Sequence, residues 1–431
     1  MLHVFLLLLS LCSFIQAASV RSSKTLVLYD ERITELKKYF KYFESLNSRS
    51  YEIDYLKIKN STSSVDLFEN EYNTYDNLII FPIKGKHLNK LVPVKSLLKF
   101  YENGGDILAI TSPDAVVDSV RLFLNELGIY PSPKDYRLVD YSSKSSTDIE
   151  ISTNELQSKV VFSTTEDKLL RFGNAGAALL DNREQIVPIL RAPRGSVTVS
   201  TSEKKKNDEP WTVGSQGYLA SGFQSLINAR ATWVGSQDLF NDKNSKENND
   251  FVQEVSKWTF REKAIIKSFG FNHKHADGTT YARTPYKVKD DVVYEIGLAE
   301  WKGDKWEPYM ADDIQFELRL VDPYYRLTLT PSYIKKGVQY YTTGEFKLPD
   351  HHGVYTFITE YKRNGISFIS ESDVKAIRHL ANDEFARSFE ISNAWVYITS
   401  IYGVIISWVL FIFLFVIISI QKKVTVEKKK N

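Results

Sequence analysis

The apolar run from Ala394 to Ile420 is the feature that most constrains this chain. It contains no charged residue, and as an α-helix it would extend about 40 Å. The hydrocarbon core of a bilayer is about 30 Å thick and needs about 20 apolar residues to cross it. Trp395, Tyr397 and Tyr402 lie in the first third of the run, where aromatic side chains would reach a membrane interface. The run therefore predicts a transmembrane helix over residues 394–420.

The two ends of the chain predict how this helix is oriented. Lys422, Lys423 and residues 428–430 add five lysines directly after the run, so the positive-inside bias places the tail, residues 421–431, in the cytosol. At the other end, Leu2–Ile15 is a short apolar run followed by Gln16-Ala17-Ala18, which is typical of a cleaved signal peptide over residues 1–18. The expected product is a type I membrane protein with its body in a lumenal or extracellular space.

Cysteine and charge limit the possible functions of that body. The single cysteine, Cys12, lies in the predicted signal peptide, so disulfides and cysteine nucleophiles are not expected in the mature chain. The sequence contains 55 Lys and Arg residues and 53 Asp and Glu residues. This near-equal balance gives no argument for nucleic-acid binding. Asn60-Ser61-Thr62 is an N-x-S/T sequon, and a lumenal Asn60 would accept a glycan.

The first part of the body, residues 22–255, alternates short apolar strands with amphipathic helices. Near-continuous apolar strands separated by helices predict an α/β domain with a parallel, doubly wound sheet. Stretches rich in polar residues or glycine are interpreted as loops, turns or surface connections; they are Tyr141–Asn154, Gly214–Gly222 and Asn241–Asp250. The expected strands are Thr25–Tyr29, Tyr51–Leu56, Asn77–Phe81 and Ile107–Ile110, and the expected helices follow Asp30, run from Val92 to Glu102, and follow Ser112-Pro113-Asp114.

The second part, residues 260–375, changes to a period of two. Asn364-Gly365 adds a hairpin signal, and short strands at regular spacing predict an antiparallel β-sandwich. A helical pattern from Ile377 to Phe389 predicts a juxtamembrane helical segment within residues 376–393. The expected strands are Val292–Leu298, Phe316–Leu320, Tyr325–Leu329, Gly337–Phe346 and Gly353–Tyr361.

Candidate chemical sites are few. The loops after the first strands contain no glycine-rich phosphate motif. Asp30 and Asp114 could meet as a carboxylate pair, although helix N-caps are the favoured interpretation. His273 and His275 could share a face of a strand and bind a metal, but no cysteine is available to complete the site. We predict no catalytic, cofactor or metal site. The two remaining pairs are interpreted as loop and turn residues, although the two adjacent carboxylates of the second could bind a divalent cation; they are His351-His352 and Asp312-Asp313.

The membrane helix and tail carry two further signals. Thr399, Gly403 and Ser407 recur every fourth residue, a small-residue stripe that lets another helix approach closely, unless the spacing is chance. Lys428 and Lys429 occupy the fourth and third positions from the carboxyl end. This placement resembles the dilysine retrieval signal of type I endoplasmic-reticulum proteins, which the COPI coat reads, although a basic cluster could also reflect topology alone.

In order and spacing, these segments resemble the family of the 48-kDa non-catalytic subunit of oligosaccharyltransferase, called DDOST in animals and the wheat-germ-agglutinin-binding protein in yeast. The resemblance covers nearly the full mature chain. It is carried by the membrane span, the dilysine end and four segments, namely Glu102–Ile110 (ENGGDILAI), Thr232–Phe240 (TWVGSQDLF), Tyr294–Leu329 (with EIGLAEWKGDKWEPYMADDIQFELRLVDPYYR) and Gly353–Ile369 (GVYTFITEYKRNGISFI).

The resemblance implies a flavodoxin-like first domain and membership of the endoplasmic-reticulum complex that transfers a lipid-linked oligosaccharide to asparagine. It also implies that catalysis belongs to a separate multispanning subunit, and that a ribophorin II-like and a small DAD-like subunit are partners. Two other classes stay open. A lumenal glycan-binding protein or cargo receptor would share the topology, and an anchored hydrolase would need a site assembled only by folding.

Overall fold

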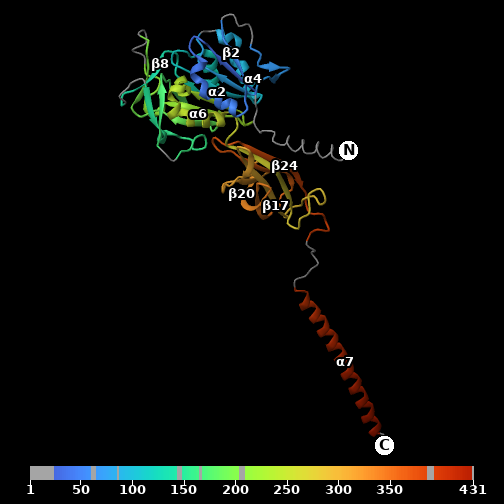
Figure 1. Cartoon of the computed structure of the whole chain (residues 1–431). Helices are drawn as coiled ribbons and strands as arrows, with labels where there is room; N and C mark the ends of the chain where they lie inside the picture. Colours follow the sequence, from blue (N-terminus) through green and yellow to red (C-terminus); the bar gives the residue numbers. More distant parts are fainter. Residues whose placement is uncertain are drawn as a thin grey trace, which may run out of the picture.

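The computed structural model describes residues 24–59, 65–84, 87–142, 148–164, 167–202, 209–385 and 393–429. Figure 1 shows an α/β domain, a β-sandwich and a long C-terminal helix following one another in space, with the sandwich between the other two. The predicted signal peptide and the Asn60 sequon lie outside the described residues. The fold class expected from the sequence is confirmed, with the corrections given below.

Nine strands of the described residues form one mixed sheet in the α/β domain. The first five in spatial order are parallel and follow the 2-1-3-4-5 order of flavodoxin-like sheets. The remaining four pair antiparallel, which the prediction of a wholly parallel sheet did not include. In order they are β2 (Glu52–Lys57), β1 (Lys24–Tyr29), β5 (Asn77–Ile80), β6 (Asp106–Ile110), β15 (Arg230–Val234), β14 (Tyr218–Gln224), β11 (Ala178–Leu180) and β7 (Ile129–Pro131), with β12 (Ile186–Arg191) beside β14.

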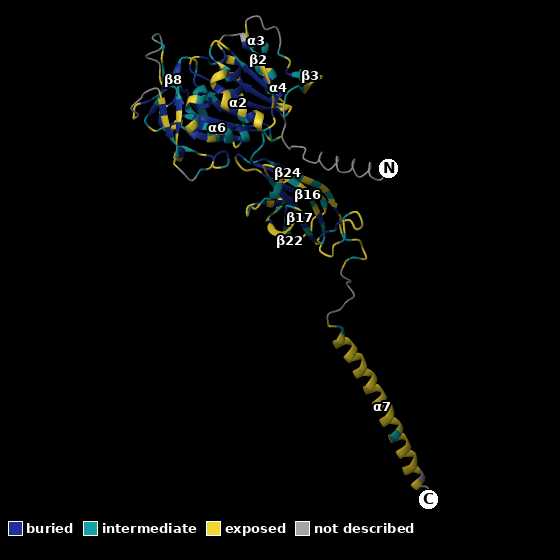
Figure 2. Ribbon diagram, viewed as in Figure 1, coloured by how far each residue is buried: buried dark blue, intermediate teal, exposed yellow. Residues whose placement is uncertain are grey.

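Helices cover both faces of this sheet, because successive residues of each buried strand point to opposite sides. Val27 and Ile79 belong to one core with the helices of the first face, and Leu28 and Ile80 belong to a second core with the helices of the other face. Figure 2 shows the strands buried between these layers. The first face carries η1 (Leu36–Tyr39), α2 (Phe40–Ser48) and α6 (Ser245–Thr259), and the second carries α3 (His87–Leu91), α4 (Val94–Glu102) and α5 (Asp118–Glu126).

Glycine residues with positive φ follow two of these helices. Gly104 follows α4 with φ at 89°, and Gly128 follows α5 with φ at 85°. This left-handed conformation at the end of a helix is one that glycine adopts without a steric penalty.

Three segments that were interpreted as loops, turns or surface connections contain regular structure. Tyr141–Asn154 includes β9 (Asp148–Ser152), Asn241–Asp250 includes the start of α6, and Gly214–Gly222 includes the start of β14. Asn248 explains the second error, because its buried side chain accepts a hydrogen bond from Arg171 N (2.9 Å) and donates one to Arg171 O (2.8 Å). A residue typical of loops is thus used for a tertiary contact. The smaller elements are β3 (Phe68–Glu69), β4 (Tyr72–Asn73), β8 (Tyr136–Asp140), β10 (Leu169–Gly173), β13 (Ser196–Ser200), η2 (Thr153–Glu155), η4 (Gly214–Gln216), η5 (Gln237–Phe240) and η6 (Asp242–Asn244).

The second domain is an antiparallel sandwich of two sheets that share one core of buried apolar side chains. Tyr294 and Ile296 from one sheet belong to this core together with Phe316 and Phe357 from the other. One sheet contains β16 (Ile265–His275), β17 (Asp291–Lys302), β22 (Val338–Lys347), β21 (Thr330–Lys335) and β18 (Lys305–Pro308), and the second contains β20 (Pro323–Thr328), β19 (Gln315–Arg319), β23 (Gly353–Tyr361) and β24 (Ile369–Ile377).

The predicted helical segment after the sandwich is wrong over its described part. Residues 369–377 form β24, an edge strand paired along its whole length with β23, and 382–384 form a turn. After Ile377 the backbone has other partners, because Arg378 N donates to Tyr286 O (3.0 Å) and Ala381 N donates to the Glu384 carboxylate (2.8 Å). The rest of the predicted segment, 386–392, lies outside the described residues.

The loop between β23 and β24 docks onto the α/β domain. The Asn228 side chain pairs with the backbone of Phe368, donating to its carbonyl (3.0 Å) and accepting from its N–H (2.6 Å). Trp258 Nε1 donates to Gly365 O (2.7 Å), and Gln224 Nε2 donates to the carbonyl of Ile366 (2.8 Å). We call these contacts of residues 362–368 the domain junction.

Arg230 lies fully buried beside the domain junction. Its Nη1 donates to the carbonyls of Trp258 and Lys263, both at 2.7 Å, and its Nη2 donates to Ala264 O at 2.8 Å. Its Nε donates to Gln224 Oε1 (3.1 Å), and its guanidinium lies 4.8 Å from the Trp258 ring centre. A single side chain thus holds the covalent connection between the two domains in place.

A buried carboxylate completes this region. Asp106 accepts hydrogen bonds from the N–H of Arg230 (2.9 Å) and from Arg261 Nε (2.6 Å). Burial raises the pKa of Asp106 to about 6, against the lowering effect of the Arg261 charge.

Candidate functional site: the membrane helix and the edge of the sheet

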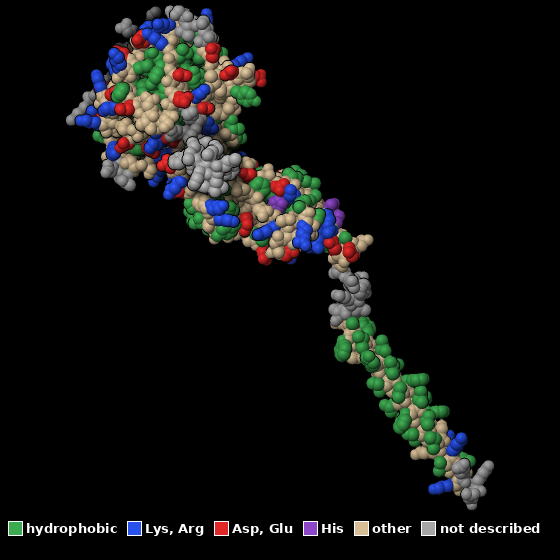
Figure 3. Space-filling model, turned by 45° about the vertical axis from the view of Figure 1, so that its right-hand side comes forward, with side chains coloured by type: hydrophobic (Ala, Val, Ile, Leu, Met, Phe, Trp, Pro, Cys, Tyr) green, Lys and Arg blue, Asp and Glu red, His purple; other side chains and the backbone are tan. Residues whose placement is uncertain are grey.

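The C-terminal helix α7 (Ala394–Lys428) is apolar and exposed along almost its whole length (Figure 2). By length and composition it is the one helix among the described residues that could cross a membrane. It continues about two turns past the predicted end at Ile420, so Lys422 and Lys423 lie on the helix itself. Figure 3 shows the uniform apolar surface of α7 with basic side chains near its end.

The three residues of the predicted stripe lie on one side of α7. Thr399 Oγ1 donates to the carbonyls of Trp395 (3.0 Å) and Val396 (2.9 Å), and Ser407 Oγ donates to Gly403 O (2.8 Å). A Cβ added at Gly403 would meet no atom within 4 Å. The hydroxyl groups are therefore satisfied within the helix, which removes the cost of placing them in an apolar environment.

Asp30 lies where a doubly wound sheet usually binds its ligand, at the carboxyl ends of neighbouring strands β1 and β5. Its buried carboxylate accepts from Lys84 N (3.1 Å) and from Arg32 N (3.0 Å), Nε (2.9 Å) and Nη2 (2.6 Å). Burial would raise the pKa of Asp30, but these hydrogen bonds and the Arg32 charge bring it below its ordinary value. Arg32 Nη2 also donates to Lys84 O (2.5 Å). The protein's own ion pair therefore occupies this position.

The predicted helix-capping roles of Asp30 and Asp114 are wrong. α2 begins at Phe40 and α5 at Asp118, each well beyond the expected cap. Asp114 instead accepts a hydrogen bond from Asn174 Nδ2 (2.7 Å). The two carboxylates thus have separate partners.

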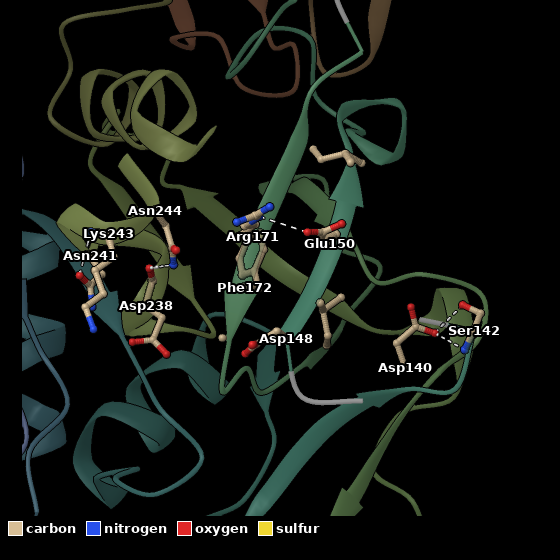
Figure 4. A pocket seen from close by; sticks show the side chains of 13 residues that line it. Asp140, Ser142, Asp148, Glu150, Arg171, Phe172, Asp238, Asn241, Lys243 and Asn244 are labelled. Carbon is tan, nitrogen blue, oxygen red and sulfur yellow. Dashed lines mark hydrogen bonds and ion pairs between the residues drawn. The ribbon is translucent and has the colours of Figure 1, made fainter. Parts of the chain in front are cut away.

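A polar groove of about 960 Å³ opens near the same edge of the sheet (Figure 4). The Arg171 guanidinium lies 3.1 Å from Glu150 Oε1, and Asp140 Oδ1 accepts a hydrogen bond from Ser142 N (2.9 Å). The pKa of Asp238 is raised, first by burial and then by the neighbouring Asp148 carboxylate. Three segments far apart in the sequence form this groove, and two of them overlap stretches interpreted as loop or surface connection, so no local sequence signal could have identified it.

The two histidines considered as metal ligands, His273 and His275, form hydrogen bonds within the sandwich domain. His273 Nδ1 lies 2.9 Å from the Tyr286 hydroxyl, and its Nε2 lies 2.9 Å from Asp373 Oδ2. Burial lowers the pKa of His273 more than the Asp373 charge raises it. His275 Nε2 contacts the carbonyl of Thr284 (2.9 Å). Within the described ranges, no cluster of three or more His, Cys, Asp or Glu side chains could hold a metal ion.

The two remaining pairs also have structural contacts. His351-His352 lies in a loop, and the ring of His352 contacts His379 with centroids 3.6 Å apart. Asp313 accepts hydrogen bonds from the Tyr361 hydroxyl (3.0 Å) and from Arg363 Nε (2.6 Å). The carboxylate that could have bound a divalent cation is already engaged by an arginine.

An α/β domain, an antiparallel sandwich and one exposed apolar helix define a membrane-anchored protein with two folded domains. Sequence models of the OST48 N-terminal domain and the OST48 middle domain match residues 16–262 and 273–419. The chain therefore belongs to the OST48 family.

Curated relatives agree over nearly the whole length. The chain is 52% identical over 425 residues to the WBP1 subunit of dolichyl-diphosphooligosaccharide–protein glycosyltransferase of Saccharomyces cerevisiae, covering 97% of this chain and 98% of that protein. It is 28% identical over 410 residues to the 48 kDa subunit of the same enzyme from Arabidopsis thaliana, covering 90% and 91%. The 48 kDa subunit from Danio rerio is 26% identical over 442 residues, covering 97% and 96%.

Proposed function

We propose that this chain is the non-catalytic, structural subunit of the endoplasmic-reticulum oligosaccharyltransferase complex, and that it supports oligosaccharide transfer to asparagine by other subunits. The observation that carries the proposal is the match to OST48-family proteins along both domains and the membrane helix, including 52% identity to a named subunit of that enzyme. The ion pair of Asp30 and Arg32 at the edge of the sheet supports a structural role, because this position has its own internal partners.

Purification of the tagged full chain from membranes in mild detergent tests the proposal. We expect mass spectrometry to recover a multispanning glycosyltransferase subunit together with ribophorin II-like and DAD-like subunits. Depletion of the chain should also leave sequons of secreted reporter proteins unoccupied. Recovery of the chain alone, with normal glycosylation after its depletion, would contradict the proposal.

The proposed topology is type I, with a signal peptide over residues 1–18, lumenal domains at 22–255 and 260–375, and a cytosolic tail at 421–431. The aromatic residues at the start of α7 and the lysines after it support this orientation. Protease added to intact microsomes should remove the tail and spare the body, and glycosidase treatment should shift the mass only if Asn60 carries a glycan. A body digested in intact microsomes would refute the topology.

We also propose that the stripe of Thr399, Gly403 and Ser407 packs against a helix of a partner subunit. Gly403→Leu would add a large side chain where close approach is needed, so association with the multispanning subunit should weaken severalfold in detergent. Ile405→Leu lies on the opposite side of α7 and serves as the matched control. Equal recovery of partners with both variants would exclude this contact surface.

The tail is proposed to carry a retrieval signal at Lys428 and Lys429 that the COPI coat recognises. α7 ends at Lys428 and Lys429 follows in a turn, so both lie at the far end of the helix. Replacement of both lysines by serine should release the chain, expressed in excess of its partners, to the Golgi apparatus. Complete retention of that variant in the endoplasmic reticulum would show that assembly alone keeps it there.

A further inference from the structure

One end of the sandwich gathers the turn between β19 and β20 together with the exit of the chain toward α7. β19 ends at Arg319 and β20 begins at Pro323, while β23 begins at Gly353 and pairs there with Ile377, the last residue of β24. Because Arg319 pairs with Thr356 near the start of β23, the turn at 320–322 lies at the same end. The domain junction, formed by residues 362–368, lies at the opposite end of β23 and β24.

Four apolar or aromatic side chains are exposed at this end. The exposed fractions are 90% for Val321, 58% for Val354, 43% for Leu320 and 41% for Tyr324. Leu320 Cδ1 lies 2.8 Å from the position of a Cβ added at Gly353, so the turn contacts the start of β23. We call Leu320, Val321, Tyr324 and Val354 the apolar tip. Exposed apolar side chains gathered at one end of a domain, unlike scattered single ones, point to an interaction site.

The connection to α7 keeps the apolar tip close to the membrane. Arg378 donates to both carboxylate oxygens of Glu384 (2.7 and 2.8 Å), and Lys287 Nζ lies 3.6 Å from the same group. These contacts fix the chain to the sandwich as far as Glu384, and α7 begins at Ala394. The residues between them, 385–393, span at most about 35 Å when fully extended. Glu384, at the end of the sandwich that bears the apolar tip, therefore stays within about 35 Å of the start of the membrane helix.

The chemistry of this end fits a lipid surface. Tyrosine combines an apolar ring with a polar hydroxyl, which suits the headgroup layer. Lys289 and Lys347 lie at the same end of the sandwich with side chains 63% exposed, in exposed ion pairs with Asp350 and Asp291 (both 3.8 Å). Exposed pairs of this kind are weak, so the two lysines can exchange these partners for lipid phosphates. Figure 3 shows histidine, basic and acidic side chains together where the sandwich faces α7. A stable interface with another protein needs about 800 Å² of matched surface on each partner. A fluid headgroup layer needs no matched surface, so it fits a projecting turn better.

We propose that the apolar tip inserts into the headgroup region of the leaflet in which α7 begins, giving the chain a second contact with lipid. The body would then be held to the bilayer at two points and would not turn freely about its connection to α7. The inference requires α7 to span a membrane, and it is independent of which subunits assemble with the chain.

A single-cysteine experiment tests this proposal in the full chain. The only native cysteine is Cys12, so Val321→Cys in a Cys12→Ser background can be labelled with an environment-sensitive fluorophore and reconstituted in phosphatidylcholine nanodiscs. Ile334→Cys is the matched control, because Ile334 is 59% exposed in the same sandwich and lies toward the end of the domain junction. We expect blue-shifted emission and quenching by nitroxide-labelled lipid at position 321, with neither at position 334.

Two results would overturn the proposal. Equal, water-like emission with no lipid quenching at both positions would show that the apolar tip stays in solvent. A blue shift at position 321 that appears only in the assembled complex, without lipid quenching, would show that a protein covers it. In a second variant, Val354→Cys carries the label and Val321→Asp should abolish lipid quenching; unchanged quenching there would also contradict the assignment.

Discussion

Loss of the Asn228 side chain should open the domain junction without unfolding either domain. Asn228 has φ at 67°, so Asn228→Gly keeps a backbone conformation that glycine adopts readily while removing both hydrogen bonds to Phe368. Each hydrogen bond has a net worth of about 0.5–1.5 kcal/mol, so the free energy of local opening should fall by about 1–3 kcal/mol. Amide exchange around Phe368 should then become about 5- to 150-fold faster, since exchange follows the opening free energy.

Hydrogen exchange with mass spectrometry on the full chain in nanodiscs measures this effect. Peptides that cover residues 362–369 should exchange faster, whereas peptides from the core strands β6 and β17 should keep their protection. Asn70→Gly provides the matched control, because Asn70 also has positive φ (47°) and lies exposed in the turn between β3 and β4. Exchange at 362–369 that matches the wild type, or that accelerates equally across both domains, would refute the local role assigned to Asn228.

Two further predictions concern the core of the α/β domain. Burial raises the pKa of Asp106 to about 6, above its ordinary value of 3.8, so the native state binds a proton that the unfolded state has already lost. The free energy of unfolding should therefore fall as pH rises from about 4 to about 6, by about 3 kcal/mol at most. Thermal unfolding curves recorded across this pH range should show a weaker pH dependence for Asp106→Asn. An unchanged pH dependence in that variant would exclude Asp106 as its source. Gly235→Ala would place a methyl group against the backbone oxygen of Gly176, so it should lower the free energy of unfolding by about 1–3 kcal/mol, and a wild-type melting temperature would contradict this packing.

The strands were the most predictable part of the fold, because their signals are local. The period-two pattern of Val292–Leu298 lies within β17, and Asn77–Phe81 corresponds closely to β5. Each strand carries enough apolar residues to specify burial without information from the rest of the chain. The hairpin signal at Asn364-Gly365 was less accurate, since β24 begins at Ile369 and the intervening residues dock onto the α/β domain.

The errors arose where a polar side chain serves a distant partner. Asp30 has the residue type and position of a helix cap, yet its acceptors are used by Arg32 and by Lys84, which lies 54 residues away. Asn248 stands in a stretch of loop-forming residues, but its buried amide pairs with the backbone of Arg171, 77 residues away. A sequence pattern reports which polar groups are present, whereas only the fold determines which of them become neighbours.

The arrangement of contacts explains how a chain without an assigned catalytic role could still be needed for glycosylation. The α/β domain and the sandwich are joined at two adjacent places, by the covalent connection that Arg230 binds and by the loop that Asn228 holds. Two attachments prevent the rotation that a single connection would permit, so the two domains are oriented as one body. The proposed contact between the membrane helix and partner subunits, along the stripe that includes Gly403, is separate from this junction. Changes at the domain junction should therefore reduce glycosylation while partners are retained, whereas changes along the stripe should weaken association with the partners.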